Sequence, residues 1–478
     1  MTISQAAGDN TINCWRILAI SSIVFFFVDF GFYLTVPAQT RIFEEIICRQ
    51  YTAQGDCKIA PVQSELAAVN GWKDTFDALP GILLSIPYGV LADRIGRKPC
   101  LLLGLLGVIL GESWTRLVCM FCFWPQILPL RLVWLAGVFR LLGGGDLVVS
   151  SLVSVIVADV FHDKDRATAL FQLSAAVMIA ELLAIPLGGA LMAWSSPWLP
   201  FVLGLLTLAA GIPLVAFLLP ETLPEPSFER NQCRTVEEED VEEGRSDASF
   251  AARLRVLFSA ISFITQRNIF LALAMFLASS LSRQSTSLLL QYSSTRYGWT
   301  IPRASLFLSV RGLVTLAVYL VLMPALSGVL TATTSLSAMQ KDRRMAQLSG
   351  ILSAAGLGMV ALAAIPAWYV AGLVISALGA GFIVFARSLA TQLVTPAQRS
   401  TLYAAVAVVQ SVGALAAGPL LADLFRAGLT LGREKMGLPF LFAGLLVGLA
   451  VAAVSAVRDN DNLPGEGDDA ERQALLGT

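Results

Sequence analysis

The sequence predicts an all-α integral membrane protein with twelve transmembrane helices in two pseudo-symmetric six-helix bundles, and three observations support this. Of the 478 residues, 56% are hydrophobic and only 14% are charged, and the mean hydropathy is +0.71. Apolar runs long enough to cross a bilayer, which takes roughly 20 residues, recur along the chain. A polar, acidic stretch near the middle divides these runs into two sets of six. Such a composition is far from that of a soluble globular domain.

Each predicted helix is an apolar run, and the glycines and prolines inside the runs are tolerated because neighbouring helices satisfy the backbone groups that they free. The runs of the first set are Trp15–Pro37, Phe76–Ala92, Leu101–Pro125, Leu132–Val160, Ala167–Trp194 and Leu199–Leu219. Those of the second set are Phe270–Gln291, Leu306–Leu326, Met345–Ile365, Trp368–Val394, Leu402–Leu424 and Leu438–Val457. Six helices in each set give both halves the same direction through the membrane.

These sets divide the chain into four parts. We expect an N-terminal bundle at 1–220, a cytoplasmic acidic linker at 221–267, a C-terminal bundle at 268–458 and a disordered cytoplasmic tail at 459–478. The linker contains VEEEDVEEGRSDAS, which is acidic and cannot bury enough apolar surface to fold alone. The bundles look like weak repeats, because RATAL and PLGGAL correspond to RSTLY and PLLADL at one shared separation of 233 residues.

The distribution of basic residues predicts the orientation of the chain. Lysine and arginine concentrate in the loops after even-numbered helices, so the positive-inside rule places those loops and both termini in the cytoplasm. We expect a multi-pass protein of the plasma membrane. Cys48 and Cys57 lie in the first outer loop, where an oxidising environment would permit a disulfide, and this argument leaves the oxidised and reduced forms both open. The net charge of −1 indicates no nucleic-acid partner.

The most specific motif is GVLADRIGRK, in the short loop between the second and third predicted helices. The pattern G-x-x-x-D-R-x-G-R-[RK] is matched by Gly89, Asp93, Arg94, Gly96, Arg97 and Lys98. With apolar runs on both sides, the sequence here resembles the major facilitator superfamily. The resemblance extends to RLLGGG in the fourth helix and to ADVFHDKDRATA, which is similar to the family's acidic-x6-Arg element through Asp159 and Arg166. LPETL after the sixth helix looks like a fungal branch often found as exporters of secondary metabolites or drugs.

The resemblance implies that these charges form a cytoplasmic gate. Asp93 would face the start of the eleventh helix, Arg94 and Arg97 would meet Asp159, and Arg166 would complete the network. Such contacts would hold the two bundles together on the cytoplasmic side and separate when the transporter opens inward. The simpler alternative is that the cluster only follows the positive-inside rule.

Ionisable side chains at bilayer depth are costly and therefore mark candidate functional sites. They are Asp29, Glu112, Arg140, Asp146, Glu181, Arg283, Arg311 and Arg387. The resemblance implies that helices 1, 4, 7 and 10 line a central cavity, which favours Asp29, Arg140, Asp146 and Arg283 as lining residues. A carboxylate that moves between apolar surroundings and a nearby arginine changes its proton affinity, so Asp29, Asp146 and Glu181 are proton-relay candidates. Static ion pairs or helix-helix hydrogen bonds are the competing interpretation.

The function that these observations favour is secondary transport by alternating access, with proton-coupled efflux of a small organic metabolite or toxin. A proton-coupled nutrient importer or a facilitative uniporter is the alternative with the same fold, and a non-transporting receptor or scaffold is a third hypothesis. We expect a monomer whose partners are a small-molecule substrate, protons and the lipid bilayer. His162 is the only histidine, and the sequence has no G-x-S-x-G or phosphate-loop motif, so we expect no enzyme, metal or cofactor.

Overall fold

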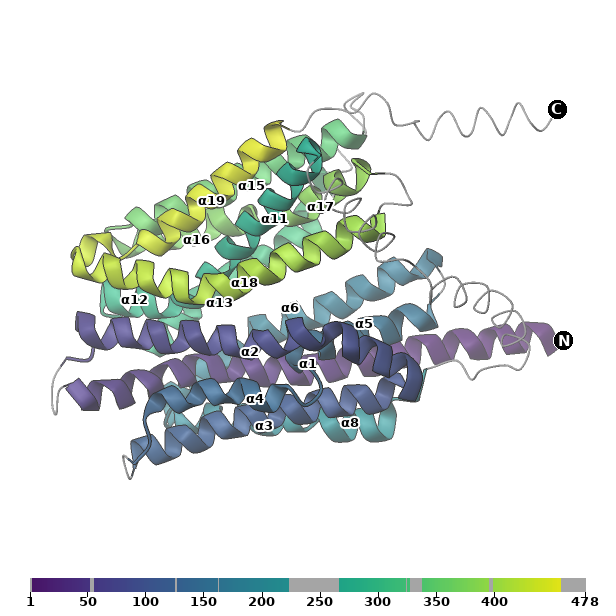
Figure 1. Cartoon of the computed structure of the whole chain (residues 1–478), viewed down its shortest axis with the longest axis horizontal. Helices are drawn as coiled ribbons and strands as arrows, with labels where there is room; N and C mark the ends of the chain where they lie inside the picture. The colour runs from purple at the N-terminus through teal and green to yellow at the C-terminus, as the bar shows by residue number, and fades with distance from the viewer. Residues whose placement is uncertain are drawn as a thin grey trace, which may run out of the picture.

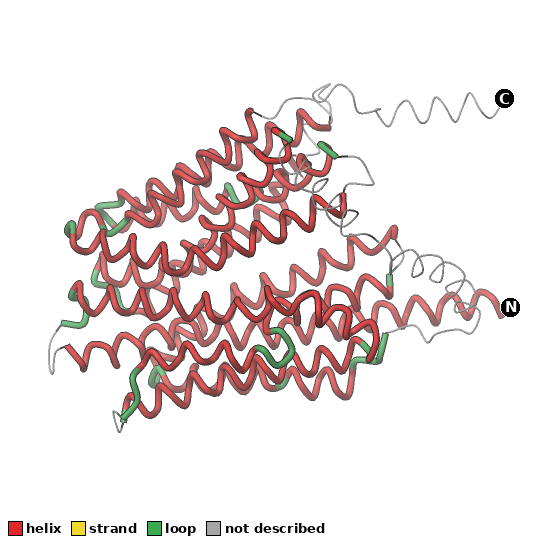
Figure 2. The backbone as a smooth tube through the Cα atoms, viewed as in Figure 1, coloured by secondary structure: helices red, strands yellow, loops and turns green. Residues whose placement is uncertain are grey.

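The computed structural model of the protein describes residues 2–51, 56–124, 127–161, 163–222, 266–323, 325–326, 338–394 and 399–456. Most of the predicted linker and all of the predicted tail therefore lie outside the described residues. Helices account for nearly all of the described chain, which contains no strand (Figure 2). The all-α prediction is confirmed.

The first half of the chain forms six membrane-length spans, two of which are interrupted. The uninterrupted helices are α1 (Thr2–Tyr51), α2 (Ala60–Ile95), α3 (Arg97–Phe123) and α6 (Asp163–Trp194). The fourth span consists of η1 (Leu130–Leu135), α4 (Ala136–Arg140) and α5 (Gly145–Val160), and the sixth of α7 (Trp198–Ala209) and α8 (Gly211–Leu218). The interruption of the fourth span falls in the predicted RLLGGG motif.

The second half repeats this arrangement. Its elements are α11 (Arg267–Gln284), η2 (Ser285–Leu288), α12 (Leu289–Tyr297), α13 (Ile301–Ala317), η3 (Val318–Leu322), α15 (Ala338–Leu362), α16 (Pro366–Leu378), α17 (Phe382–Gln392), α18 (Arg399–Thr430), η5 (Arg433–Lys435) and α19 (Leu438–Ala456). Within the described ranges, eleven helices are long and apolar enough to cross a membrane. The predicted span that is not among these eleven is the seventh, the broken segment from α11 to α12, whose many buried serine, threonine and glutamine side chains lower its hydropathy.

The two halves form two layers of helices, each packed around apolar residues of its own (Figure 1). We call the end of the layers where α1 ends and α2 begins the distal end, and the end where α2 meets α3 the proximal end. In Figure 1 α2 and α18 run close together at the distal end and diverge toward the proximal end. The two halves are therefore close together at the distal end and further apart at the proximal end.

Two helices extend further than the apolar runs predicted. Helix α1 continues through Pro37 to Tyr51, and α2 begins at Ala60, well before the predicted start at Phe76. The predicted long outer loop is therefore mostly helix. Hydropathy does not detect these segments because they contain polar residues, some of which, such as Glu44, Gln63 and Lys73, are buried. A proline inside a membrane helix is tolerated where neighbouring helices pack against it.

Candidate functional site

The two halves are in close contact at the distal end, where α2 crosses α18. A Cβ atom on Gly71 would lie 2.5 Å from the carbonyl oxygen of Gly418, so only glycine allows this approach of the two backbones. One turn further along α2, the Thr75 hydroxyl donates to the carbonyl oxygen of Leu415 at 3.0 Å. The crossing is therefore both sterically close and hydrogen-bonded.

A buried polar network also joins the halves at this end. The Gln63 side chain is fully buried and donates to the carboxylate of Glu44 at 2.7 Å. From the second half, Gln291 donates to the Gln63 carbonyl oxygen at 2.7 Å and Thr295 donates to its side-chain oxygen at 2.9 Å. Lys58 forms an ion pair with Glu44. We call Glu44, Lys58, Gln63, Gln291, Ser294 and Thr295 the distal gate, because Lys58 also reaches Ser294 of α12 at 2.7 Å.

A disulfide stabilises the first-half side of the distal gate. Cys48, near the end of α1, is bonded to Cys57, which directly precedes Lys58. The carbonyl oxygen of Cys57 accepts a further hydrogen bond from Gln63 at 2.9 Å. The covalent link therefore fixes the segment from which Lys58 reaches the second half.

Toward the proximal end, the faces of α2 and α18 that touch at the distal end are no longer in contact with each other. Ile86 lies on the α2 face that carries Thr75, three turns further along, and is 79% exposed. A Cβ atom on Gly89 would meet nothing within 4 Å. On α18, Val408 lies two turns before Leu415 and is 63% exposed. The contact faces of α2 and α18 thus separate in their proximal halves, in agreement with the diverging ribbons of Figure 1.

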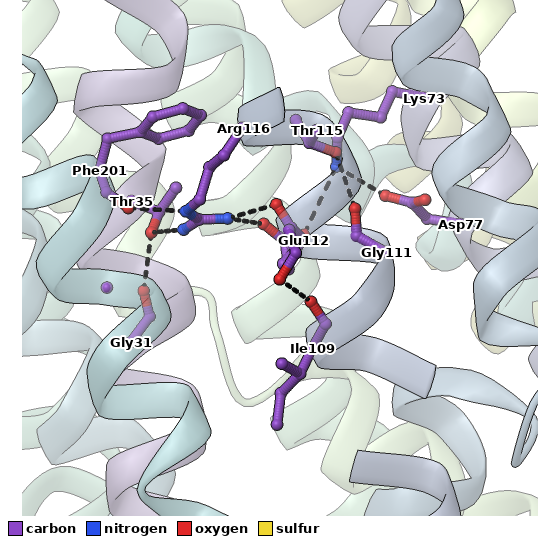
Figure 3. A network of polar contacts seen from close by, with 12 residues as sticks. Gly31, Thr35, Lys73, Asp77, Ile109, Gly111, Glu112, Thr115, Arg116 and Phe201 are labelled. Atoms are coloured by element: carbon purple, nitrogen blue, oxygen red, sulfur yellow. Dashed lines mark hydrogen bonds and ion pairs between the residues drawn. The ribbon is translucent and has the colours of Figure 1, made fainter. Parts of the chain in front are cut away.

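The middle of the first half holds a cluster of buried charges, part of which Figure 3 shows. Lys73 of α2 lies 2.7 Å from Asp77 and 3.8 Å from Glu112 of α3. Glu112 in turn contacts Arg116 at 2.8 Å and Arg140 of α4 at 3.0 Å. Arg140, only 1% exposed, also lies 3.3 Å from Asp77 and forms an ion pair with Asp146. We call Lys73, Asp77, Glu112, Arg116, Arg140 and Asp146 the charge cluster.

The charge cluster contains three cations and three anions, so each buried charge has an opposite neighbour. Besides its ion pair with Glu112, Arg116 donates hydrogen bonds to the Phe201 carbonyl oxygen at 2.8 Å and to the Thr35 hydroxyl at 3.0 Å (Figure 3). These contacts connect α3 to α7 and α1. Complete pairing is what makes burial of charge tolerable inside a membrane protein.

The predicted site residues divide between this cluster and the boundary between the halves. Arg140 and Asp146 lie in the charge cluster. Asp29 of α1 is half-buried and lies within electrostatic range of Asp146 and Glu181. Glu181 of α6 is half-buried and lies within electrostatic range of Arg311 of α13, in the other half. Arg283, in the last turn of α11, is exposed and lies within electrostatic range of Tyr33 of α1.

The prediction missed half of the charge cluster. Lys73 and Asp77 fell at the edge of or outside the predicted second span, and Arg116 was not included among the membrane charges. Their spacing could have found them, because Lys73 and Asp77, like Glu112 and Arg116, stand four residues apart and so share one helix face. Among the described residues, no group of three histidine, cysteine, aspartate or glutamate side chains is placed to hold a metal ion.

The charges predicted to form the cytoplasmic gate lie at the proximal end, and the structure arranges some of them differently. Arg97 lies 2.7 Å from Asp159, as expected, but Asp93 lies 3.4 Å from Arg97 instead of facing α18. Arg94 makes no ion pair within the described residues, which corrects its predicted pairing with Asp159. The side chain of Arg166 lies outside the described residues. The contacts stay within the first half because the proximal ends of the halves are apart.

An additional acidic residue supports this loop. The backbone N–H groups of Arg97 and Lys98 donate to the carboxylate of Glu221 at 3.0 and 3.2 Å. A carboxylate at the start of a helix interacts favourably with the free N–H groups there. Gly96 precedes them with φ of 109°, a conformation that side chains rarely adopt. Glu221 belongs to LPETL, and the resemblance of that motif to the fungal branch did not predict this contact with the loop.

Comparison with known proteins agrees with this architecture. The family model described as Major Facilitator Superfamily matches residues 18–418. The chain is 37% identical to the MFS-type transporter avaK of Aspergillus versicolor, with 93% of each chain covered. It is 34% identical to the efflux pump ustT of Aspergillus flavus, with 92% of this chain and 88% of that protein covered.

Solved structures share the fold at low sequence identity. The nucleoside transporter NupG aligns with a TM-score of 0.62 and 14% identity over 94% of this chain and 99% of that chain. The human organic anion transporter MFSD10 aligns with a TM-score of 0.55 and 15% identity over 92% of this chain and 99% of that chain. The family model matches most of the chain, and a transporter relative is matched over nearly its whole length. Together with the two layers of membrane helices, these matches establish that this chain belongs to the major facilitator superfamily and is a multi-pass membrane transporter, not an enzyme.

Proposed function

We propose that this transporter exports a small organic metabolite or toxin across the plasma membrane, driven by protons. The observation that supports alternating access is the closed distal gate combined with the free proximal faces of α2 and α18. If both termini are cytoplasmic, the proximal end faces inward and this arrangement is an inward-open state, through which exporters and importers both pass. The direction of export rests on the relatives named as efflux pumps.

The predicted site residues take two roles in this proposal. Asp29, Glu181 and Arg283 would contact substrate or carry protons between the two sides. Their electrostatic interactions with Asp146, Arg311 and Tyr33 support this role. Arg140 and Asp146 would connect that region to the charge cluster, so that a proton gained by a carboxylate alters its balance. Both halves are on one chain, so a single monomer contains every element that the cycle requires.

Closure of the proximal end would complete the cycle. The motif residues proposed for this cytoplasmic gate are Gly89, Asp93, Arg94, Gly96, Arg97, Lys98, Asp159 and Arg166. Gly89 has open space on its side-chain face, and Arg94 has no ion-pair partner within the described residues, so both are available for contact with the second half. Opening of the distal gate and closure of this one would alternate.

The experiment is a metabolite comparison between cells with and without the gene, measured separately in cells and medium. An exporter predicts that disruption moves at least one metabolite from the medium into the cells. A protonophore added to cells with the gene should reproduce that change. Loss of uptake on disruption would instead indicate the importer, and unchanged distributions would contradict transport of any cellular metabolite.

A further inference from the structure

Two arginines near the middle of membrane spans in the second half make no direct ion pair within the described residues. Arg283 lies in the last turn of α11, in the middle of the broken seventh span, and Arg311 lies mid-way along α13. Within the described ranges neither guanidinium makes an ion pair or hydrogen bond, whereas every charged residue of the charge cluster is paired. Charged side chains at membrane depth normally have a partner or face water. Arg387 also makes no ion pair within the described residues, but it lies near the end of the span Pro366–Gln392, where a long side chain can extend to the membrane surface. The positions of Arg283 and Arg311 near the middle of their spans therefore need an explanation.

The position of both arginines is fixed at the boundary between the halves. Gln284, next to Arg283, donates to Asp74 of α2 at 3.4 Å. A Cβ atom on Gly312, next to Arg311, would lie 3.5 Å from Leu182 of α6, the neighbour of Glu181. Both guanidinium groups also lie within electrostatic range of the Tyr319 hydroxyl. Both arginines therefore belong to segments that line the boundary with the first half.

The first half presents aromatic and acidic side chains toward this boundary. Phe26, Asp29, Phe30 and Tyr33 follow the spacing of one face of α1, and the rings of Phe26 and Phe30 stack with centroids 5.4 Å apart. Tyr33 lies within electrostatic range of Arg283. A ligand with an apolar body and one charged group could place its apolar body against α1 and its charged group near the arginines of the second half.

The sign of that charged group follows from chemistry. Asp29 and Glu181 also lack ion pairs within the described part of the chain, but a carboxylate can take up a proton and become neutral. A guanidinium keeps its charge under all conditions relevant to a protein. The unpaired arginines therefore require an anion, whereas the unpaired carboxylates do not require a cation.

We propose that Arg283 and Arg311 bind an acidic group, a carboxylate or phosphate, of an amphipathic substrate whose apolar body packs against the aromatic face of α1. This inference rests on the proposed transport function and adds the substrate class to it. Two arginines can hold such a group through several charge-assisted hydrogen bonds. The acidic group would supply the direct ion pair that neither arginine makes within the described residues.

The test measures binding to the full-length protein in lipid nanodiscs with three probes that share one apolar body. Pyrenebutyric acid, pyrenebutanol and pyrenebutylamine differ only in the terminal group, and energy transfer from tryptophan to pyrene reports binding after subtraction of the signal from empty nanodiscs. We expect the acid to bind at least about tenfold more tightly than the alcohol, the size of one good charged hydrogen bond. Equal binding of acid and alcohol, preference for the amine, or binding of none would overturn the inference.

Variants assign the preference to the two arginines. Arg283→Gln with Arg311→Gln should lower the affinity for the acid by about 10- to 100-fold and leave the alcohol unchanged. The lysine versions of both positions should retain part of the preference, which a purely structural role would not predict. Arg303→Gln is the matched control, because it removes an exposed arginine from the same helix about 12 Å away along its axis. An unchanged acid preference in the glutamine variant would contradict the assignment.

The outcome is separable from that of the transport proposal. The selectivity of the unmodified protein needs no variant to fold and no knowledge of direction. If the metabolite comparison identifies exported compounds that carry no acidic group, the substrate class is wrong while export stands. If the acid binds through the two arginines but disruption changes no distribution, export is wrong while the binding site stands.

Discussion

Replacing Gly71 by alanine should shift this transporter away from the state described above. The new methyl group would lie 2.5 Å from the Gly418 carbonyl oxygen and 3.3 Å from the Cβ atom of Ala422. Neither neighbour is the flexible end of a long side chain, so the helices themselves must separate. The distal crossing would open, and the free proximal faces would be able to close.

The magnitude follows from the required displacement. An ordinary carbon–oxygen contact needs about 3.4 Å, so α2 and α18 must move apart by about 0.9 Å or deform. Forcing an additional methyl group into a packed contact typically costs about 1–3 kcal/mol. Because that penalty applies only to the state in which the distal ends touch, the ratio of distally open to distally closed molecules should rise by about 5- to 150-fold.

The assay is a distance measurement between spin labels at the distal ends of α2 and α18. Cysteines replace Ser64 and Arg426 for labelling, in a background from which the five cysteines outside the disulfide, at positions 14, 100, 119, 122 and 233, are removed. The long-distance population should increase in Gly71→Ala but not in Gly448→Ala, where a Cβ atom would meet nothing within 4 Å. Identical distance distributions in Gly71→Ala and the unmodified protein would refute the reasoning.

Three further predictions concern the other contacts. Replacing Glu112 by glutamine leaves the buried cations short of one partner, so thermal unfolding of the purified protein should lose about 3–5 kcal/mol of stability, and an unchanged melting temperature would contradict complete pairing in the charge cluster. Serine at Cys48 and Cys57 should release the segment that carries Lys58, so the distal long-distance population should rise, and an unchanged distance distribution would contradict this role of the disulfide. Arg140→Gln should abolish the protonophore-sensitive part of export while protein still reaches the membrane, and unchanged export would remove Arg140 from the site.

Most of the fold could be predicted from hydropathy because lipid is a uniform solvent for the outer surface of the bundle. Side chains that face lipid must be apolar, and that requirement produces the runs from which twelve spans were counted. The proximal motif could be found from its spacing, and Arg97 does contact Asp159. Arg140 was identified by its position in RLLGGG, and it is the most deeply buried charge of the cluster.

The same reasoning explains what the sequence did not predict. Lys73, Asp77 and Arg116 face other helices, so their polarity reduces the apparent hydropathy of segments that nevertheless lie within the bundle. A charge buried against a partner and a charge in a solvated loop look alike in one sequence. Asp93 pairs with Arg97 in this structure, and its predicted contact with α18 would require the proximal ends to approach.

The charge cluster has a consequence for energy transduction. All six of its residues belong to helices of the first half, so a rigid rotation of one half against the other breaks none of its ion pairs. The energy of these ion pairs is then the same whichever side of the membrane the pathway faces, and the pairs themselves contribute nothing to the preference between the two orientations. Only the arrival or departure of a proton or a ligand can change that energy, which makes the cluster sensitive to occupancy and indifferent to motion.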